Sequence, residues 1–407
     1  MNNIYKKENI LYNLFNFCFY NIILLKGELS LEINLNREDF LNAIKIVEKI
    51  TAQKGIQPIL SNILIETTSQ DRVRFCATDL NLSISYKIPA SVIEEGSITL
   101  NARKISEIVS KISSVEVNLK TTAESNNIRI KSAKTEFDLV GMSPNEFPKI
   151  LNENEEKQSQ EVKTITLDKN EFSKALKQVI FAVSAQETQA VLTGVCFNIE
   201  NNTLELASTD GNRLTRTRRE LSQNYPENIT FIVPSKTLAE VQRISSIIED
   251  ENLTLKVEKN KILFQFKDLS FQSRLIEGVY PKYQQLIPKN NDKKITLDRV
   301  ELINAIERVA IMVNDRTNII KFNFIQNQLE IMADTPEAGR SKDYIDIEYD
   351  KEDMLTAFNY KYVLDALKNM DSKMVEIQIS DVLAAAIFKP KEDNDNYICL
   401  IMPVKVQ

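Results

Sequence analysis

The residues best suited to chemistry in this sequence are carboxylates, because the chain contains no histidine. Without histidine there is no histidine-based triad, general base or metal ligand. The clearest candidates are Asp79, Asp210 and Asp334, each lying in a turn between two strand-like runs. A single Thr-Asp-Gly sequence, as at Asp210, could serve a metal or phosphoenzyme site. Because the aspartate recurs in three repeats, we expect a structural role instead, in which its carboxylate caps backbone N–H groups of its own turn.

Other patterns that favour catalysis are also absent from the sequence. The four cysteines form no C-x-x-C pair, and glycine totals only eight, with no glycine-rich phosphate loop. Cys76 and Cys196 fall inside strand-like runs, where cysteine is usually a small buried apolar residue. Few cysteines and no disulfide framework are typical of proteins in a reducing cytoplasm. We therefore predict a cytoplasmic, non-catalytic protein with no cofactor and no metal.

Composition narrows the class of protein further. The 407 residues are 43% hydrophobic and 27% charged, which is ordinary for a soluble globular protein of two or three domains. The formal net charge of −6 gives no overall basic signature for nucleic acid. Any contact with DNA would require basic residues gathered on one face.

An internal repeat organises the chain. Helical sequences beginning at Arg37, Lys169 and Arg299 align and recur at intervals of about 130 residues, with apolar residues at i, i+3, i+4 and i+7. Asp168 and Asp298 precede two of them as predicted N-caps. A second helix recurs from Asn101, Val233 and Phe358.

The rest of each repeat alternates apolar and polar residues in short β-branched runs, which predicts strands. The fold class is α+β, with three tandem domains of about two helices and six to eight strands each. Polar joins at Asn152–Glu161 and Pro288–Lys294 favour boundaries there. The predicted domains are residues 31–155, 160–288 and 292–407.

Residues 1–30 stand apart from the repeats. Ile10–Leu25 is the one candidate membrane segment, but it is shorter than the roughly twenty apolar residues of a spanning helix. Lys26-Gly27-Glu28 can be encoded by a purine-rich ribosome-binding sequence, and Leu31 by a TTG start codon. We interpret residues 1–30 as leader DNA read as protein in preference to a genuine extension. In either case no packed core is expected from residues 1–28.

Five motifs in order carry a resemblance to a known family. They are P-I-L-S-N at Pro58–Asn62, T-D-G-N-R-L at Thr209–Leu214, V-P-S-K at Val233–Lys236, Y-P-K-Y-Q-Q-L-I-P at Tyr280–Pro288 and M-P-V-K-V at Met402–Val406. With the repeats, they resemble the bacterial sliding clamp, the beta subunit of DNA polymerase III, from about Leu31 to Gln407. The resemblance implies a non-catalytic homodimer that closes head to tail as a ring of six clamp domains. Helices would line a hole around double-stranded DNA, and strands would form the outer shell.

The resemblance also implies partners and sites. A clamp loader would close the ring, and DNA polymerases and repair proteins would insert short peptides into one hydrophobic cleft per subunit. By motif, the cleft residues are Leu192, Thr209, Gly211, Asn212, Arg213, Leu214, Pro281, Gln285, Leu286, Leu400, Ile401, Met402, Pro403 and Val404. Arg213 and the nearby backbone would orient the peptide. For Leu214 and Ile401 alone, ordinary core packing is an equally good interpretation.

The remaining implied sites concern DNA and the dimer. The family's DNA contacts fall on Lys54, Gln186 and Lys236, and the analogy pairs Phe137 and Leu139 of the first domain with Ile311 and Met312 of the third. Lysines and arginines on the repeated helices favour phosphate contacts without sequence readout. The alternative interpretation is that they only solvate exposed helix faces, because acids share the same helices.

Two other classes of protein are alternatives to a clamp. An enzyme is disfavoured by the missing histidine, phosphate loop and metal spacing. A repeat-built scaffold that binds partners but not DNA, such as a specialised clamp paralogue, is not excluded by the sequence, and retention on circular DNA would distinguish it from a clamp.

Overall fold

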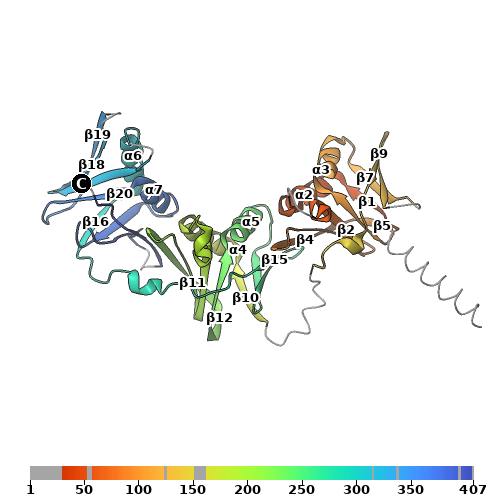
Figure 1. The fold of residues 1–407 in the computed structure, drawn as a ribbon, viewed down its shortest axis with the longest axis horizontal. Coiled ribbons are helices and arrows are strands. Elements are labelled where there is room, and N and C mark those ends of the chain that lie inside the picture. The colour runs from red at the N-terminus through yellow and green to blue at the C-terminus, as the bar shows by residue number, and fades with distance from the viewer. Residues whose placement is uncertain are drawn as a thin grey trace, which may run out of the picture. The chain divides into compact units, whose positions relative to one another are not determined.

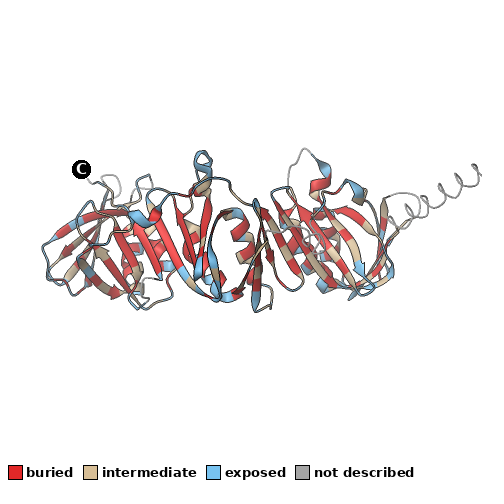
Figure 2. Ribbon diagram, turned by 90° about the horizontal axis from the view of Figure 1, so that it is seen from below, coloured by how far each residue is buried: buried red, intermediate tan, exposed pale blue. Residues whose placement is uncertain are grey.

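The computed structural model describes residues 30–52, 57–122, 126–150, 162–313, 316–335, 339–392 and 396–405. The predictions for residues 1–28 and for Lys54 therefore lie outside the described residues. The chain divides into two compact units, one of Met1–Thr164 with Thr254–Ser273 and one of Ile165–Leu253 with Arg274–Gln407. In both units, buried residues alternate along the strands and follow one side of the helices (Figure 2).

Among its described residues, the first unit combines strands with one helix pair (Figure 1). One sheet has the order β5-β1-β7-β8-β9, and a second contains β13-β14-β15-β4-β3-β2-β6. Helices α2 (Arg37–Val47) and α3 (Ala102–Lys111) pack against each other. The strands are β1 (Glu32–Asn36), β2 (Asn62–Ser69), β3 (Arg72–Thr78), β4 (Leu82–Pro89), β5 (Ser91–Glu94), β6 (Ser97–Asn101), β7 (Glu116–Thr121), β8 (Asn127–Ser132), β9 (Thr135–Val140), β13 (Asn252–Val257), β14 (Lys261–Gln265) and β15 (Leu269–Arg274).

In the part of the second unit that the structure describes there are two helix pairs (Figure 1). One of its sheets has the order β11-β12-β23-β22-β21-β16, and the other has the order β19-β18-β17-β20. Helix α4 (Lys169–Val179) packs on α5 (Ser235–Ser245), and α6 (Arg299–Ala310) packs on α7 (Tyr360–Lys368). The strands are β10 (Lys163–Asp168), which leads into α4, β11 (Gly194–Thr209), β12 (Arg213–Pro234), β16 (Lys293–Asp298), β17 (Ile319–Ile325), β18 (Gln328–Thr335), β19 (Gly339–Asp346), β20 (Met354–Asn359), β21 (Met374–Ile379), β22 (Ala386–Pro390) and β23 (Tyr397–Ile401).

The repeated helices begin where the sequence predicts. The Asp168 carboxylate accepts the backbone N–H of Glu171, and the Asp298 carboxylate accepts those of Val300 and Glu301. These bonds satisfy amides that the first helical turn leaves without partners, so both predicted N-caps are confirmed. The aligned residues Phe40, Phe172 and Leu302 are all buried, as the apolar periodicity requires.

Strands of one repeat complete a sheet that belongs to the preceding repeat. β15 pairs antiparallel with β4, and β23 pairs antiparallel with β12. The first pairing explains why Thr254–Ser273 belongs to the first compact unit, although its sequence lies in the second repeat. The predicted domain boundaries follow the repeats, whereas the compact units follow strand pairing, so those boundaries stay a prediction.

The polar join after Pro288 is anchored to the second unit. Asn291 is only 7% exposed, and its amide nitrogen donates to the Gln378 carbonyl at 3.0 Å and the Ala385 carbonyl at 3.3 Å. These two bonds attach the segment between the second and third repeats to the sheet of the third. The sequence predicts a polar, exposed join here. In the structure one of its polar side chains, Asn291, is buried and hydrogen-bonded.

The described cysteines are buried, as predicted for Cys76 and Cys196. Burial raises the pKa of each of these two thiols to about 12, and it also raises the pKa of Cys399. The thiolate, which is the reactive form, is therefore scarce at neutral pH. Among the described residues no helix is long and apolar enough to cross a membrane, and no group of acidic or sulfur side chains is placed to hold a metal ion.

Candidate functional site

The turn at Asp210 brings five predicted cleft residues together. The Asp210 carboxylate accepts the backbone N–H groups of Asn212 and Arg213 at 2.9 and 3.0 Å. Gly211 sits at a φ of 89°, which favours glycine in this turn. Asp79 caps its own turn in the same way, through the N–H groups of Asn81 and Leu82. The turn-capping role of Asp79 and Asp210 is thus confirmed.

Asp334 behaves differently from the other two repeated aspartates. It forms an ion pair of 3.0 Å with Arg340, across the β18–β19 hairpin. Its carboxylate is partly exposed, and the residues of its turn lie outside the described part of the chain.

The C-terminal strand lies beside the Asp210 turn. β12 and β23 pair with Arg213 opposite Ile401 and Leu214 opposite Leu400. Beyond β23, the Met402 backbone N–H donates to the Asn212 carbonyl at 2.9 Å. The Val404 N–H donates to the Ala357 carbonyl at 2.8 Å, which holds the last described residues on the same unit.

Two buried tyrosines attach the segment from Tyr280 to Leu286 to this region. The Tyr280 hydroxyl accepts the Thr209 backbone N–H at 3.1 Å, and the Tyr283 hydroxyl donates to Glu205 at 2.6 Å. Burial raises the pKa of both hydroxyls, so they stay protonated at neutral pH. The short helix η7 (Tyr283–Leu286) thereby fixes Gln285 and Leu286 at the surface.

The predicted cleft residues divide into a buried base and an exposed layer. Leu192, Leu214 and Leu400 belong to one apolar cluster with Tyr280 and Tyr283. Ile401 is fully buried in the neighbouring core of the third repeat. Leu286 and Met402 are 57% and 44% exposed at the edge of this base. Leu214 and Ile401 are therefore core residues, while Leu286 and Met402 are apolar side chains at the surface.

Arg213 is occupied within the chain. Its Nε donates to Asp210 at 3.0 Å, and its two terminal nitrogens donate to Asp365 and to the Phe181 carbonyl, both at 2.6 Å. The guanidinium also lies 4.3 Å from the centroid of the Tyr362 ring. Each of its nitrogens thus already has an acceptor, so Arg213 acts on the site by holding the Asp210 turn on the third repeat.

We expect Arg213→Ala to destabilise the protein by about 3 kcal/mol, because it leaves partly buried acceptors without their charged donor. The midpoint of urea unfolding measures this loss. Arg103→Ala is the matched control, since the Arg103 side chain is 84% exposed and its ion pair with Glu107 contributes under about 1 kcal/mol. Equal effects of the two substitutions would contradict a structural role for Arg213.

The predicted DNA residues that the structure describes are exposed. Gln186 lies just before the 3-10 helix η6 (Glu187–Thr193), and Lys236 lies in the first turn of α5. Several helix cations pair with acids on the helices, at 2.7 Å for Lys174 with Glu171 and 2.6 Å for Lys368 with Glu307. Other exposed helix lysines have no ion pair with any residue that the structure describes; these are Lys45, Lys49, Lys104, Lys111 and Lys177.

The predicted dimer residues lie on an edge strand of the first repeat and just after a helix of the third repeat. Phe137 and Leu139 point to the same side of β9, the last strand of its sheet, and both are half-buried. Ile311 follows α6 and is 77% exposed, while Met312 packs against the core of the third repeat. Nearby, the Ser341 hydroxyl donates to the Val309 carbonyl at 2.9 Å, so the edge strand β19 lies beside the end of α6. The sequence predicts a strand after the Asp334 turn, where β19 lies, but it does not single this strand out as part of the dimer joint.

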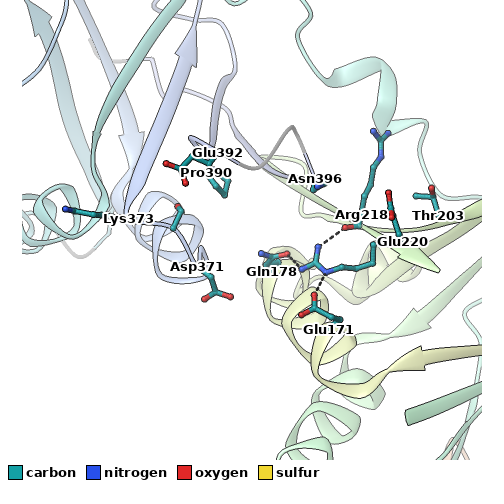
Figure 3. A pocket seen from close by; sticks show the side chains of 12 residues that line it. Glu171, Gln178, Thr203, Arg218, Glu220, Asp371, Lys373, Pro390, Glu392 and Asn396 are labelled. Carbon is teal, nitrogen blue, oxygen red and sulfur yellow. Dashed lines mark hydrogen bonds and ion pairs between the residues drawn. The ribbon is translucent and has the colours of Figure 1, made fainter. Parts of the chain in front are cut away.

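A polar pocket of about 620 Å³ opens at the other end of the β12–β23 pairing (Figure 3). Arg219 is one of its lining residues; it donates to the Gln178 side chain at 2.9 Å and lies 3.4 Å from Glu171. The wall of the pocket carries acidic side chains such as Asp371 and basic side chains such as Lys373. No sequence motif points to this pocket, and its mixed charges select no class of ligand.

Comparisons with known proteins agree with this arrangement. Three family descriptions match in tandem: the N-terminal domain of the DNA polymerase III beta subunit over residues 31–151, the central domain over 166–282 and the C-terminal domain over 284–405. The Beta sliding clamp of Staphylococcus aureus is 31% identical over 385 residues, covering 92% of this chain and 99% of the relative.

Solved structures resemble the whole repeat region. A DNA polymerase sliding clamp from Bacillus subtilis has a TM-score of 0.86 and 26% identity, covering 93% of this chain and all of that one. A sliding clamp from Bartonella birtlesii, solved with bound griselimycin, has a TM-score of 0.85 and 28% identity, with the same coverage.

Proposed function

Because the chain belongs to the family of bacterial beta sliding clamps, the DNA polymerase III beta subunits, we propose that two copies close head to tail around duplex DNA. The chain is then half of a ring, and its function is to tether the replicative polymerase to its template. It is a processivity factor and performs no reaction itself. The observation that carries this proposal is the tandem match of all three clamp domains over residues 31–405.

The contact with DNA needs few residues. A closed ring is retained by topology, so phosphate contacts can be weak enough to allow sliding. Gln186 and Lys236 are exposed, as such contacts require, and Lys54 completes the set proposed from the family motif. The unpaired helix lysines named above supply further charge without sequence specificity.

The partner site is the apolar surface around Leu286 and Met402. A peptide with apolar anchors would cover these exposed side chains and rest on the base of Leu192, Leu214 and Leu400. Met adapts its shape to different apolar groups, which suits a surface shared by several polymerases and repair proteins. Pro281, Gln285, Pro403 and Val404 would border the peptide, and Thr209, Gly211, Asn212 and Arg213 would hold the turn beneath it.

The dimer joint brings β9 of one copy against the third repeat of the other. An unpaired strand edge exposes N–H and C=O groups that a partner strand can satisfy. In this proposal, Phe137 and Leu139 are covered by the exposed Ile311 and by Met312 of the second copy. A clamp loader opens and closes such a joint, and the setting is the cytoplasm, where replication takes place.

Retention on nicked circular DNA, loaded with a clamp loader and ATP, tests the function. We expect the protein to stay on circles through high salt and to be released when the DNA is linearised, because only topology holds it. Release that depends on salt but not on cutting would instead mean binding by charge. The chain would then be a partner-binding scaffold.

A further inference from the structure

A second pocket lies beside the apolar surface proposed for partner peptides. It has a volume of about 430 Å³, and its lining includes Ile287, Ile387 and Ile398. These three residues pack in the same apolar cluster as Leu214 and Leu400, which form the base of the proposed peptide site. The pocket and the peptide site therefore share one apolar base within the second compact unit.

The register of three strands places this pocket one row further along the sheet. Leu214 of β12 and Ile387 of β22 both lie opposite Leu400 of β23. Arg216 and Lys389 follow two residues later on β12 and β22. Side chains two residues apart point to the same face of a strand and are roughly 7 Å apart. An apolar row of the peptide site thus gives way to a row with a base on each outer strand.

The lining of this pocket is basic. All charged residues in its described lining are cations, namely Arg216, Arg218, Lys289, Lys294 and Lys389. Two carboxylates lie close to them without lining the pocket: Glu205 is 2.7 Å from Arg218, and Glu376 is 3.4 Å from Lys389. Five cations beside two carboxylates leave an excess of positive charge. In this respect the pocket differs from the one in Figure 3, whose wall has both signs.

One buried carboxylate connects the pocket with the peptide site. Glu205 accepts the Arg218 Nε–H at 2.7 Å and lies 3.8 Å from Arg216. The Tyr283 hydroxyl donates to the same carboxylate at 2.6 Å, and Tyr283 begins the short helix that carries Leu286. Both arginines and the exposed Leu286 are thus held by one group before a partner arrives. Groups that are already in position lose less entropy when they bind a ligand.

The pocket lies on the face of the sheet that is turned away from helix α4. The Thr217 hydroxyl donates to the Gln178 side chain of α4 at 2.7 Å, so Thr217 points toward that helix. Because successive side chains alternate between the faces of a strand, Arg216 and Arg218 point to the opposite face. The lysines proposed to meet DNA lie on the helices. An acidic protein segment is therefore a better occupant of the pocket than the DNA of the ring.

We propose that this basic pocket binds acidic side chains that lie next to the apolar anchors of a partner peptide. The inference rests on the proposed function, because it assumes the peptide site around Leu286 and Met402. An extended peptide advances about 3.3 Å per residue, so an acidic residue about two positions beyond an anchor reaches the basic row. The pocket then distinguishes by charge among partners whose apolar anchors are alike.

The charge of the whole protein makes this attraction local. The formal net charge is −6, so an acidic peptide is repelled on average and gains affinity only where it reaches the pocket. Lys289 and Lys294 are exposed at the pocket, so their attraction for a carboxylate is screened by salt. The preference for acidic partners should therefore weaken as ionic strength rises, whereas the apolar anchors should not respond in this way.

Matched peptides test the proposal. The probe is a labelled peptide from the clamp-binding segment of the replicative polymerase, extended by three glutamates or by three glutamines, at one end and then at the other. Fluorescence anisotropy measures the ratio of the two affinities. We expect the glutamate peptide extended toward the pocket to bind about tenfold more tightly at low salt. Lys289→Gln combined with Lys294→Gln should reduce this ratio to about twofold or less, and a ratio is insensitive to a general loss of folded protein.

Lys259→Gln combined with Lys267→Gln is the matched control, since both lysines are exposed in the first compact unit and neither is in the described lining of the pocket. It should keep the tenfold ratio. Equal affinities of the glutamate and glutamine peptides for the unmodified protein, at both ends, overturn the inference while the proposed function stands. If the glutamine peptides do not bind at all, the proposed peptide site and this inference both fall. Weaker binding of a short DNA duplex to the pocket variant, with an unchanged peptide ratio, would assign the pocket to nucleic acid and overturn the inference.

Discussion

Replacing Ile311 and Met312 together by alanine is expected to convert the dimer to monomers and to abolish retention on circular DNA. Ile311 is 77% exposed in the single chain, so its apolar surface is available for burial in the joint. At about 0.8 kcal/mol for each buried methylene, the two truncations cost roughly 3 kcal/mol for each joint. A ring of two copies has two joints, so the dissociation constant should rise by about four orders of magnitude.

Sedimentation equilibrium measures the mass, and the circular-DNA assay measures retention. Val115→Ala is the control, because Val115 is a 72% exposed apolar residue of the first repeat that lies on neither β9 nor β19. It should leave both readings unchanged. A full dimer mass for the double variant at the concentration where the unmodified protein dimerises would remove Ile311 and Met312 from the joint.

Replacing Met402, Pro403 and Val404 by Ser-Asn-Ser is expected to abolish binding of partner peptides. The two backbone hydrogen bonds of this segment, from Met402 to Asn212 and from Val404 to Ala357, can form with any residue except proline. The substitution therefore removes apolar side chains and keeps the path of the chain. Loss of exposed anchors of this kind costs at least about 2 kcal/mol each, which corresponds to a fall in affinity of 100-fold or more.

Fluorescence anisotropy with a labelled peptide from the clamp-binding segment of the replicative polymerase measures this loss. Ile247→Ser is the control, since Ile247 is 55% exposed beyond the end of α5 and lies outside the apolar cluster of the site. The substituted chain should still be retained on circular DNA, because the dimer joint is made by other residues. Unchanged peptide affinity would refute the assignment of this surface.

Local rules made much of the fold predictable. The repeated helices follow from apolar spacing and from N-cap aspartates, which act through neighbouring backbone amides. Asp79 and Asp210 cap their turns through residues two and three positions later, so their recurrence was enough to predict structure instead of catalysis. Burial of Cys76 and Cys196 follows from their strand-like surroundings in the same way.

Site chemistry was predicted less well, because burial of a side chain depends on distant partners. Leu214 and Leu286 are both apolar in the sequence, yet one is 1% exposed and the other 57%. Arg213 could have faced a peptide, but Asp365 and the Phe181 carbonyl, both far from it in the chain, occupy its guanidinium. No local pattern reports such contacts.

Residue patterns are sufficient to establish three similar α+β repeats, the starts of their helices and the absence of any histidine chemistry. They do not establish which strands share a sheet, which is known only from the folded chain. β15 joins β4 and β23 joins β12 across repeat boundaries, and β9 and β19 remain as open edges. Strands pair through backbone N–H and C=O groups, which almost every residue carries. A sequence can therefore predict where strands lie without predicting which strands are neighbours. The edges left over therefore became visible only once the sheets were assembled.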